Sequence, residues 1–154
     1  MGATDQRAPK KARVGGAWQL KTIEGEPFGS ESLKGHYYLL YFGGTLCPDV
    51  CPLTLHKMQK AQMMLNRSSE GKQYIQVEPV FVTTNPEYDT PERLAQYKKQ
   101  LLSPDFICLR ADSNVHPDLL QMLKAFKVPV GLSEQEKEKF ADFFAEQRRK
   151  RWFW

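Results

Sequence analysis

Three short apolar segments of this chain alternate with three segments that carry the residue spacing of a helix. The apolar segments have strand length and are rich in β-branched and aromatic residues, which pack well in a pleated sheet. Strands that alternate with helices in this way are typical of α/β folds with parallel strand pairs. The sequence therefore predicts an α/β fold, with strands within 37–42, 75–85 and 106–112 and helices within 51–66, 90–101 and 116–126.

Local signals refine two of the predicted helices. In "TPERLAQYKKQL", Thr90 is in the position of an N-cap and Pro91 is at the first helical position, where its missing N–H costs nothing. In the helix before it, apolar residues recur at helix-like intervals, and this spacing predicts the helix itself. These residues are Leu55, Met58, Met63 and Leu65.

The size and charge of the chain limit its class. Its 154 residues favour one domain with tails, and 41% hydrophobic residues suffice for a core. No apolar run reaches the roughly 18 residues that span a membrane. The net charge of +4 is concentrated at the two ends, which argues against a nucleic-acid-binding protein. We expect a basic N-terminal tail at 1–15, with no secretory signal, a folded domain at 16–131 and a C-terminal amphipathic helix with an aromatic tail at 132–154.

The C-terminal segment has an unusual ending. A capping-box signature and three phenylalanines predict an amphipathic helix that closes on "RRKR". The last three residues are Trp152, Phe153 and Trp154. They either fold back onto the protein's own core or anchor it in a partner or at a membrane surface, where Trp is favoured.

Cys47 and Cys51 are four residues apart at the predicted start of a helix. On a helix this spacing brings two side chains within roughly 5–6 Å at Cβ, and a helix N-terminus favours the thiolate. The pair could bind copper(I), form a disulfide, or consist of two bystander cysteines. Zinc usually needs four ligands, and the one nearby histidine, His56, lies about 140° round the helix from Cys51. We interpret His56 as a surface residue.

Other thiol enzymes fit the pattern less well. A thioredoxin-type pair has two intervening residues, whereas three separate these cysteines. A thiol peroxidase would carry Thr or Ser three positions before its cysteine, where this chain has Gly44. Cys108, inside an apolar strand, is predicted to be a buried packing residue.

The segments "LKGHYYLLYFGGTLCPDVCP", "VEPVFVTTNPEYDTPERLAQY" and "LLQMLKAFKVPVG" resemble the Sco/SenC family of thioredoxin-like copper proteins, which help build the copper sites of cytochrome c oxidase. The resemblance implies a thioredoxin-like three-layer sandwich for 16–131 and copper bound by two cysteines and a histidine. Cys47 and Cys51 match the two cysteines, and Asp49 between them matches the motif.

The sequence departs from the family pattern in several places. The family histidine lies in a β-hairpin after the region that matches "KVPVG", but here no histidine follows His116, which we interpret as an ordinary helix-start residue. Asn85 stands where the family often has Asp, and the usual N-terminal membrane anchor is not seen. Loss of the hairpin would leave an unpaired strand edge, which the C-terminal helix or another protein would have to cover.

These departures favour a degenerate Sco-like protein that is an accessory or structural subunit of a mitochondrial respiratory assembly, cytochrome c oxidase or a supercomplex that contains it, and not an enzyme. Expected partners are subunits of that complex, with membrane-surface contact through the aromatic tail. The expected location is the inner membrane, facing the intermembrane space. The alternative is an active copper chaperone or thiol-disulfide reductase for oxidase assembly, which uses Cys47 and Cys51 to hold copper(I) or to form a disulfide.

Overall fold

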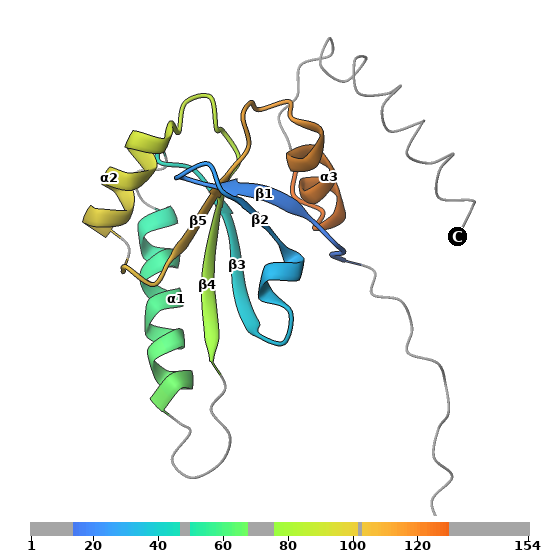
Figure 1. Ribbon diagram of the computed structural model, residues 1–154. Helices are drawn as coiled ribbons and strands as arrows, with labels where there is room; N and C mark the ends of the chain where they lie inside the picture. The colour runs from blue at the N-terminus through green and yellow to red at the C-terminus, as the bar shows by residue number, and fades with distance from the viewer. Residues whose placement is uncertain (1–13, 47–49, 68–75, 102, 130–154) are drawn as a thin grey trace, which may run out of the picture.

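The computed structural model describes residues 14–46, 50–67, 76–101 and 103–129. Five strands of these residues form one sheet in the order β2-β1-β5-β4-β3, with helices on both of its faces (Figure 1). The elements are β1 (Gln19–Thr22), β2 (Pro27–Gly29), the 3-10 helix η1 (Ser30–Leu33), β3 (Tyr37–Gly43), α1 (Val50–Arg67), β4 (Val77–Thr83), α2 (Pro91–Leu101), β5 (Ile107–Arg110) and α3 (Pro117–Ala125).

The parallel pairing predicted from the sequence is confirmed. β3 pairs with β4 along its whole length, from Tyr37 opposite Val77 onward, and β4 pairs with β5 in the same direction. β1 runs antiparallel to both β5 and β2. The turn between β1 and β2 passes through Gly25, whose φ of +87° is readily adopted only by glycine. β2 and η1 were not predicted from the sequence.

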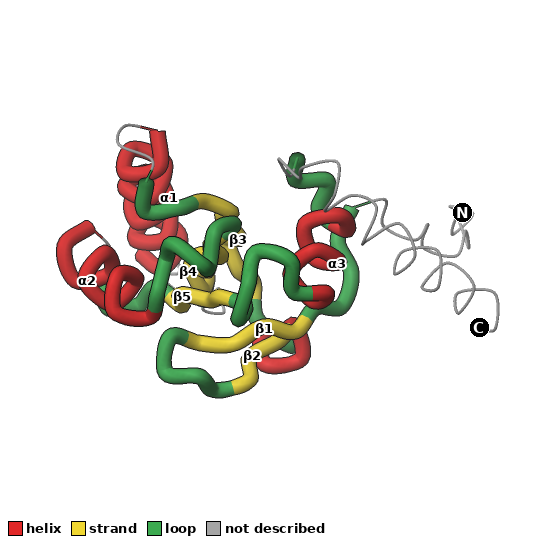
Figure 2. The backbone as a smooth tube through the Cα atoms, turned by 90° about the horizontal axis from the view of Figure 1, so that it is seen from above, coloured by secondary structure: helices red, strands yellow, loops and turns green. Residues whose placement is uncertain are grey.

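The sheet separates two hydrophobic clusters, so the three-layer architecture is also confirmed. α1 and α2 cover one face and α3 covers the other (Figures 1 and 2). Successive side chains of β4 point to opposite faces: Phe81 packs with Leu55 of α1 and Leu94 of α2, whereas Val80 and Val82 pack on the α3 side. A strand that is buried on both faces is typical of the centre of a parallel sheet.

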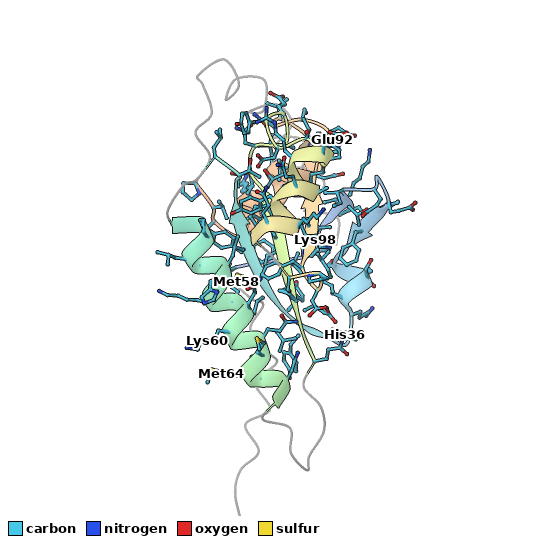
Figure 3. The ribbon with its side chains drawn as sticks, turned by 90° about the vertical axis from the view of Figure 1, so that its left-hand side faces the viewer. His36, Met58, Lys60, Met64, Glu92 and Lys98 are labelled. Atoms are coloured by element: carbon cyan, nitrogen blue, oxygen red, sulfur yellow. The ribbon has the colours of Figure 1, made fainter. Side chains whose placement is uncertain are left out.

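The predicted helix at 51–66 is confirmed as α1, but only part of the apolar residues that predicted it are buried. Leu55 is fully buried and Met58 packs against the same cluster, but Met63 is 53% exposed and Leu65 is 41% exposed. The helical period explains this result, because the buried side of the helix continues from Leu55 to Gln62, while positions 63 and 65 lie about 80° to either side of Leu55. Figure 3 shows Lys60 and Met64 on the side of α1 that faces away from α2.

Two predicted helix starts are confirmed by their hydrogen bonds. The hydroxyl of Thr90 accepts a hydrogen bond from the backbone N of Arg93 at 3.3 Å, at the start of α2. His116 is the N-cap of α3, and its Nδ1 accepts from the backbone N of Asp118 at 3.3 Å. His116 is therefore a helix-start residue, as predicted.

β3 forms one outer edge of the sheet that the structure describes. Along its length, side chains from Tyr38 to Phe42 are only half-buried, in contrast to those of β4. The predicted C-terminal helix, the aromatic tail at 152–154 and most of the N-terminal tail lie outside the described residues. Among the helices that are described, none combines the length and the apolar character that a bilayer span requires.

Candidate metal or redox centre

The predicted cysteine pair lies where β3 passes into α1. Parallel strands end at one edge of a sheet, and the loops after β4 and β5 lie at this edge, at the top of Figure 1. α1 begins at Val50, so the backbone of Cys51 is in the first helical turn, as predicted. Cys47 and Asp49 lie outside the described residues, so the spacing of the two sulfur atoms stays a prediction.

The loop that leads to Cys47 is held by a buried carboxylate. Asp89 is 0% exposed, and the backbone N of Thr45 lies 3.2 Å from its Oδ2 and 3.4 Å from its Oδ1. The hydroxyls of Thr45 and Thr83 also donate to this carboxylate, the latter at 2.5 Å. These bonds join the loop after β3, the end of β4 and the loop before α2.

The electrostatics of α1 favour a negatively charged ligand or thiolate at its start. The helix has no acidic residue in its first turn, and its sequence from 50 to 67 contains no Asp or Glu. The free N–H groups of a helix N-terminus add a partial positive charge there. A thiol at this end of a helix has a lowered pKa in known thiol proteins, and the thiolate is the form that binds soft metals.

Among the described residues, which leave out Cys47 and the side chain of Cys51, no group of three His, Cys, Asp or Glu is arranged to hold an ion. His36 and His56 are exposed, the latter as predicted, and the Nδ1 of His116 is used at the start of α3. Two thiolates nevertheless fit copper(I), which accepts soft sulfur ligands.

Cys108 is not part of this centre. It is 4% exposed and packs in the cluster that contains Phe81 and Leu94, which confirms the predicted packing role. Burial raises the pKa of its thiol to about 11, against a smaller lowering by the charge of Lys98. A thiol with this pKa is almost entirely protonated at neutral pH and is a poor ligand.

Apolar side chains are exposed next to the cysteine segment. Leu46, which precedes Cys47, is 59% exposed, and Leu53, the fourth residue of α1, is 64% exposed. Tyr88, beside Asp89, is 37% exposed, and the guanidinium of Arg93 lies 4.1 Å from its ring centroid. Another protein could therefore approach the segment.

Thr45, Thr83 and Asp89 were missed in the sequence. Thr83 is the last residue of β4, and Thr45 closely follows β3. Polar residues directly after parallel strands gather at one edge of the sheet, and this signal could have identified them. The residues in contact are up to 44 positions apart in the sequence, so no local sequence pattern predicts these contacts.

Comparison with known proteins gives a consistent match. A family model described as SCO1/SenC matches residues 6–144. The SCO2-like protein RP587 of Rickettsia prowazekii is 35% identical over 132 residues, which are 86% of this chain and 62% of that protein. Protein SCO2, mitochondrial, of Saccharomyces cerevisiae is 36% identical over 95 residues, which are 62% of this chain and 30% of that protein. The chain thus spans less than two thirds of the length of these relatives.

Solved structures agree with the fold. Arabidopsis thaliana ScoI with copper bound has a TM-score of 0.64 and 30% identity, over 74% of this chain and 66% of that one. BsSco, described as a member of the Sco family of cytochrome c oxidase assembly proteins, has a TM-score of 0.62 and 20% identity, over 84% of this chain and 74% of that one. These likenesses confirm the thioredoxin-like sandwich predicted from the sequence.

Proposed function

Because the chain belongs to the SCO1/SenC family, we propose that it is a copper chaperone, which holds copper(I) on Cys47 and Cys51 for the assembly of cytochrome c oxidase. One observation carries the proposal. Cys51 is in the first turn of α1, directly after a loop that Asp89 holds at the carboxyl edge of the parallel strands.

The residues of the chain have separate parts in this function. The two thiolates would hold the ion, which supplies the oxidase with the metal of its copper site. The N-terminus of α1 favours their negative charge. The exposed Leu46, Leu53 and Tyr88 would let a partner protein come close enough to exchange ligands. Arg93, stacked on Tyr88, adds a positive charge beside this surface.

We propose that a third ligand comes from the partner or from a side chain outside the described residues. Two-coordinate copper(I) on two thiolates would be easily passed on, since a ligand of the acceptor can add without displacing a fixed imidazole. The similarity to the mitochondrial SCO2 protein of yeast supports a mitochondrial location. Within the same proposal the protein lies at the inner membrane, faces the intermembrane space, and contacts the membrane surface through Trp152, Phe153 and Trp154.

A second candidate is an accessory subunit of a respiratory complex, which is supported by the edge strand β3. Its side chains from Tyr38 to Phe42 are half-buried, and an apolar strand edge is a place where another polypeptide can pair. In this role the cysteines would be retained without copper transfer. The protein would then co-purify with the complex in a fixed ratio.

Complementation distinguishes the two candidates. Cells that lack the protein would be supplied with the wild type, with Cys47→Ser, Cys51→Ser, or with Cys108→Ser as the control. A chaperone predicts that oxidase activity returns with the wild type and the control but not with the first two variants, although all four accumulate equally. Full activity with Cys47→Ser and Cys51→Ser, together with fixed-ratio co-purification, would instead support the accessory subunit.

A further inference from the structure

Asp89 is a fully buried acidic residue beside the cysteine segment. Its side chain is 0% exposed, yet its hydrogen-bond partners among the described residues are two threonines rather than a cation. No salt bridge to Asp89 is found among the described residues. A carboxyl group is costly to bury unless hydrogen bonds replace its water, so the donors from Thr45 and Thr83 are essential to its position.

The surroundings of Asp89 fix it from both sides. Its own backbone N donates to the carbonyl of Asn85 at 2.8 Å, which closes the turn before α2. The hydroxyl of Thr83 accepts from the backbone N of Asn85 at 3.1 Å and donates to Asp89. The carboxylate is therefore held firmly on the β4 side, while its other contacts reach across to Thr45 on the loop after β3.

We infer that Asp89 is a positioning residue for the cysteine pair, and that it acts by holding Thr45. The inference rests on the proposed use of Cys47 and Cys51. Thr45 lies two residues before Cys47, and the helix that contains Cys51 is fixed by the burial of Leu55. The described residues on the two sides of the cysteine segment are thus each held, Thr45 by Asp89 and α1 by its buried Leu55.

This restriction has a direct chemical consequence. Closing a disulfide, or binding one ion with two thiolates, costs the entropy of bringing the two sulfur atoms together. If the backbone of Thr45 is held, part of this entropy is already lost when the protein folds. The disulfide, or the ion bound by both thiolates, is then favoured. Release of Thr45 would shift the equilibrium from the disulfide toward the two free thiols.

Isosteric changes at the two threonines test the inference. Thr45→Val removes the hydroxyl donor from the loop, and Thr45→Ser restores it. Thr83→Val removes a donor to the same carboxylate from the strand side and serves as the comparison for loss of stability. The metal-free protein is equilibrated with glutathione: the two cysteine thiols lose two protons and two electrons to form the disulfide, and glutathione disulfide is reduced to two thiols.

In Thr45→Val, the thiol–disulfide equilibrium constant is expected to shift about tenfold toward the dithiol form. This shift corresponds to a rise of about 30 mV in the reduction potential of the pair. Thr45→Ser returns to within about twofold of the wild type. Thr83→Val is expected to change this equilibrium constant less than Thr45→Val does, even if the two variants lose the same stability. Asp89→Asn is expected to shift the equilibrium toward the dithiol form as well. Adding Thr45→Val to Asp89→Asn should shift it less than Thr45→Val does in the wild type, because the two residues act through one contact.

Two results would overturn the inference alone. In the first, the wild type forms the Cys47–Cys51 disulfide but Thr45→Val has the same equilibrium constant. In the second, Thr45→Val and Thr83→Val shift equally, in proportion to their lost stability. A wild-type pair that neither forms the disulfide nor binds copper(I) would overturn the proposed function, and this inference with it.

Discussion

The hydroxyl of Thr83, the last residue of β4, donates a hydrogen bond of 2.5 Å to the carboxylate of the buried Asp89. This bond joins the centre of the sheet to the loop before α2. The carboxylate of Asp89 thus has one partner at the end of β4, Thr83, and another in the loop that leads to the cysteines, Thr45. The structure therefore predicts that Thr83 matters for the stability of the whole domain.

Thr83→Val should lower the free energy of unfolding by about 2 kcal/mol, because a hydrogen bond to a buried carboxylate is lost and no water replaces it. Thr83→Ser keeps the hydroxyl and should cost less. Urea unfolding, followed by circular dichroism, measures both. Equal stability of Thr83→Val and the wild type would show that the buried bond contributes nothing.

Two leucines of α1 provide a matched pair for the packing of the helix. Leu55→Ala should lower the free energy of unfolding by about 2–5 kcal/mol, since its side chain is fully buried against Phe81 and Leu94 and its removal leaves a cavity. Leu53→Ala, two residues earlier on the same helix, should change it by less than about 0.5 kcal/mol, because this side chain is 64% exposed. Similar losses for both would contradict the orientation of α1.

Cys108 should resist alkylation in the native protein. Burial raises the pKa of its thiol from the ordinary value of 9.0 to about 11, so the thiolate fraction near pH 8 falls by about a hundredfold. Iodoacetamide labelling followed by mass spectrometry should therefore modify Cys108 at least that much more slowly in buffer than in urea. Labelling at the same rate in both would contradict its burial.

The same raised pKa predicts how stability changes in alkali. Below the ordinary pKa of 9.0 the thiol is protonated in both folded and unfolded chains, and its contribution is fully present. As the pH rises toward about 11, the unfolded chain loses this proton first, so the folded state is progressively destabilised. Cys108→Ala should show a shallower loss of stability between these pH values, and an unchanged slope would exclude the thiol as its cause.

The fold could be predicted from the sequence where local signals decide the structure. The strand "YYLLYF" and its two successors are apolar and short, and each is followed by a helical pattern, so their parallel pairing follows from general rules of chain connection. Thr90 and His116 act on the first turns of their own helices, and their roles were correct for that reason. β2 and η1 are three and four residues long, which is too short for a periodic pattern to be detected.

The candidate site could be predicted only in part. The cysteines form a motif that is visible in the sequence, and the position of Cys51 at a helix start agrees with it. The burial of Asp89 depends on Thr45, 44 positions away, and an acidic residue in a loop is ordinarily expected to face solvent. Met63 and Leu65 show the opposite case, since apolar character alone did not reveal that they lie outside the buried arc of α1.

The central claim concerns copper(I) on the cysteine pair, and its most direct test is an anaerobic titration of the reduced protein against a competing copper(I) chelator. The account predicts that the wild type and Cys108→Ser each bind one copper(I) ion per chain, and that Cys47→Ser and Cys51→Ser each lose this binding while they remain folded. Binding of one ion that survives in both Cys47→Ser and Cys51→Ser, or no binding by the folded wild type, would contradict the claim.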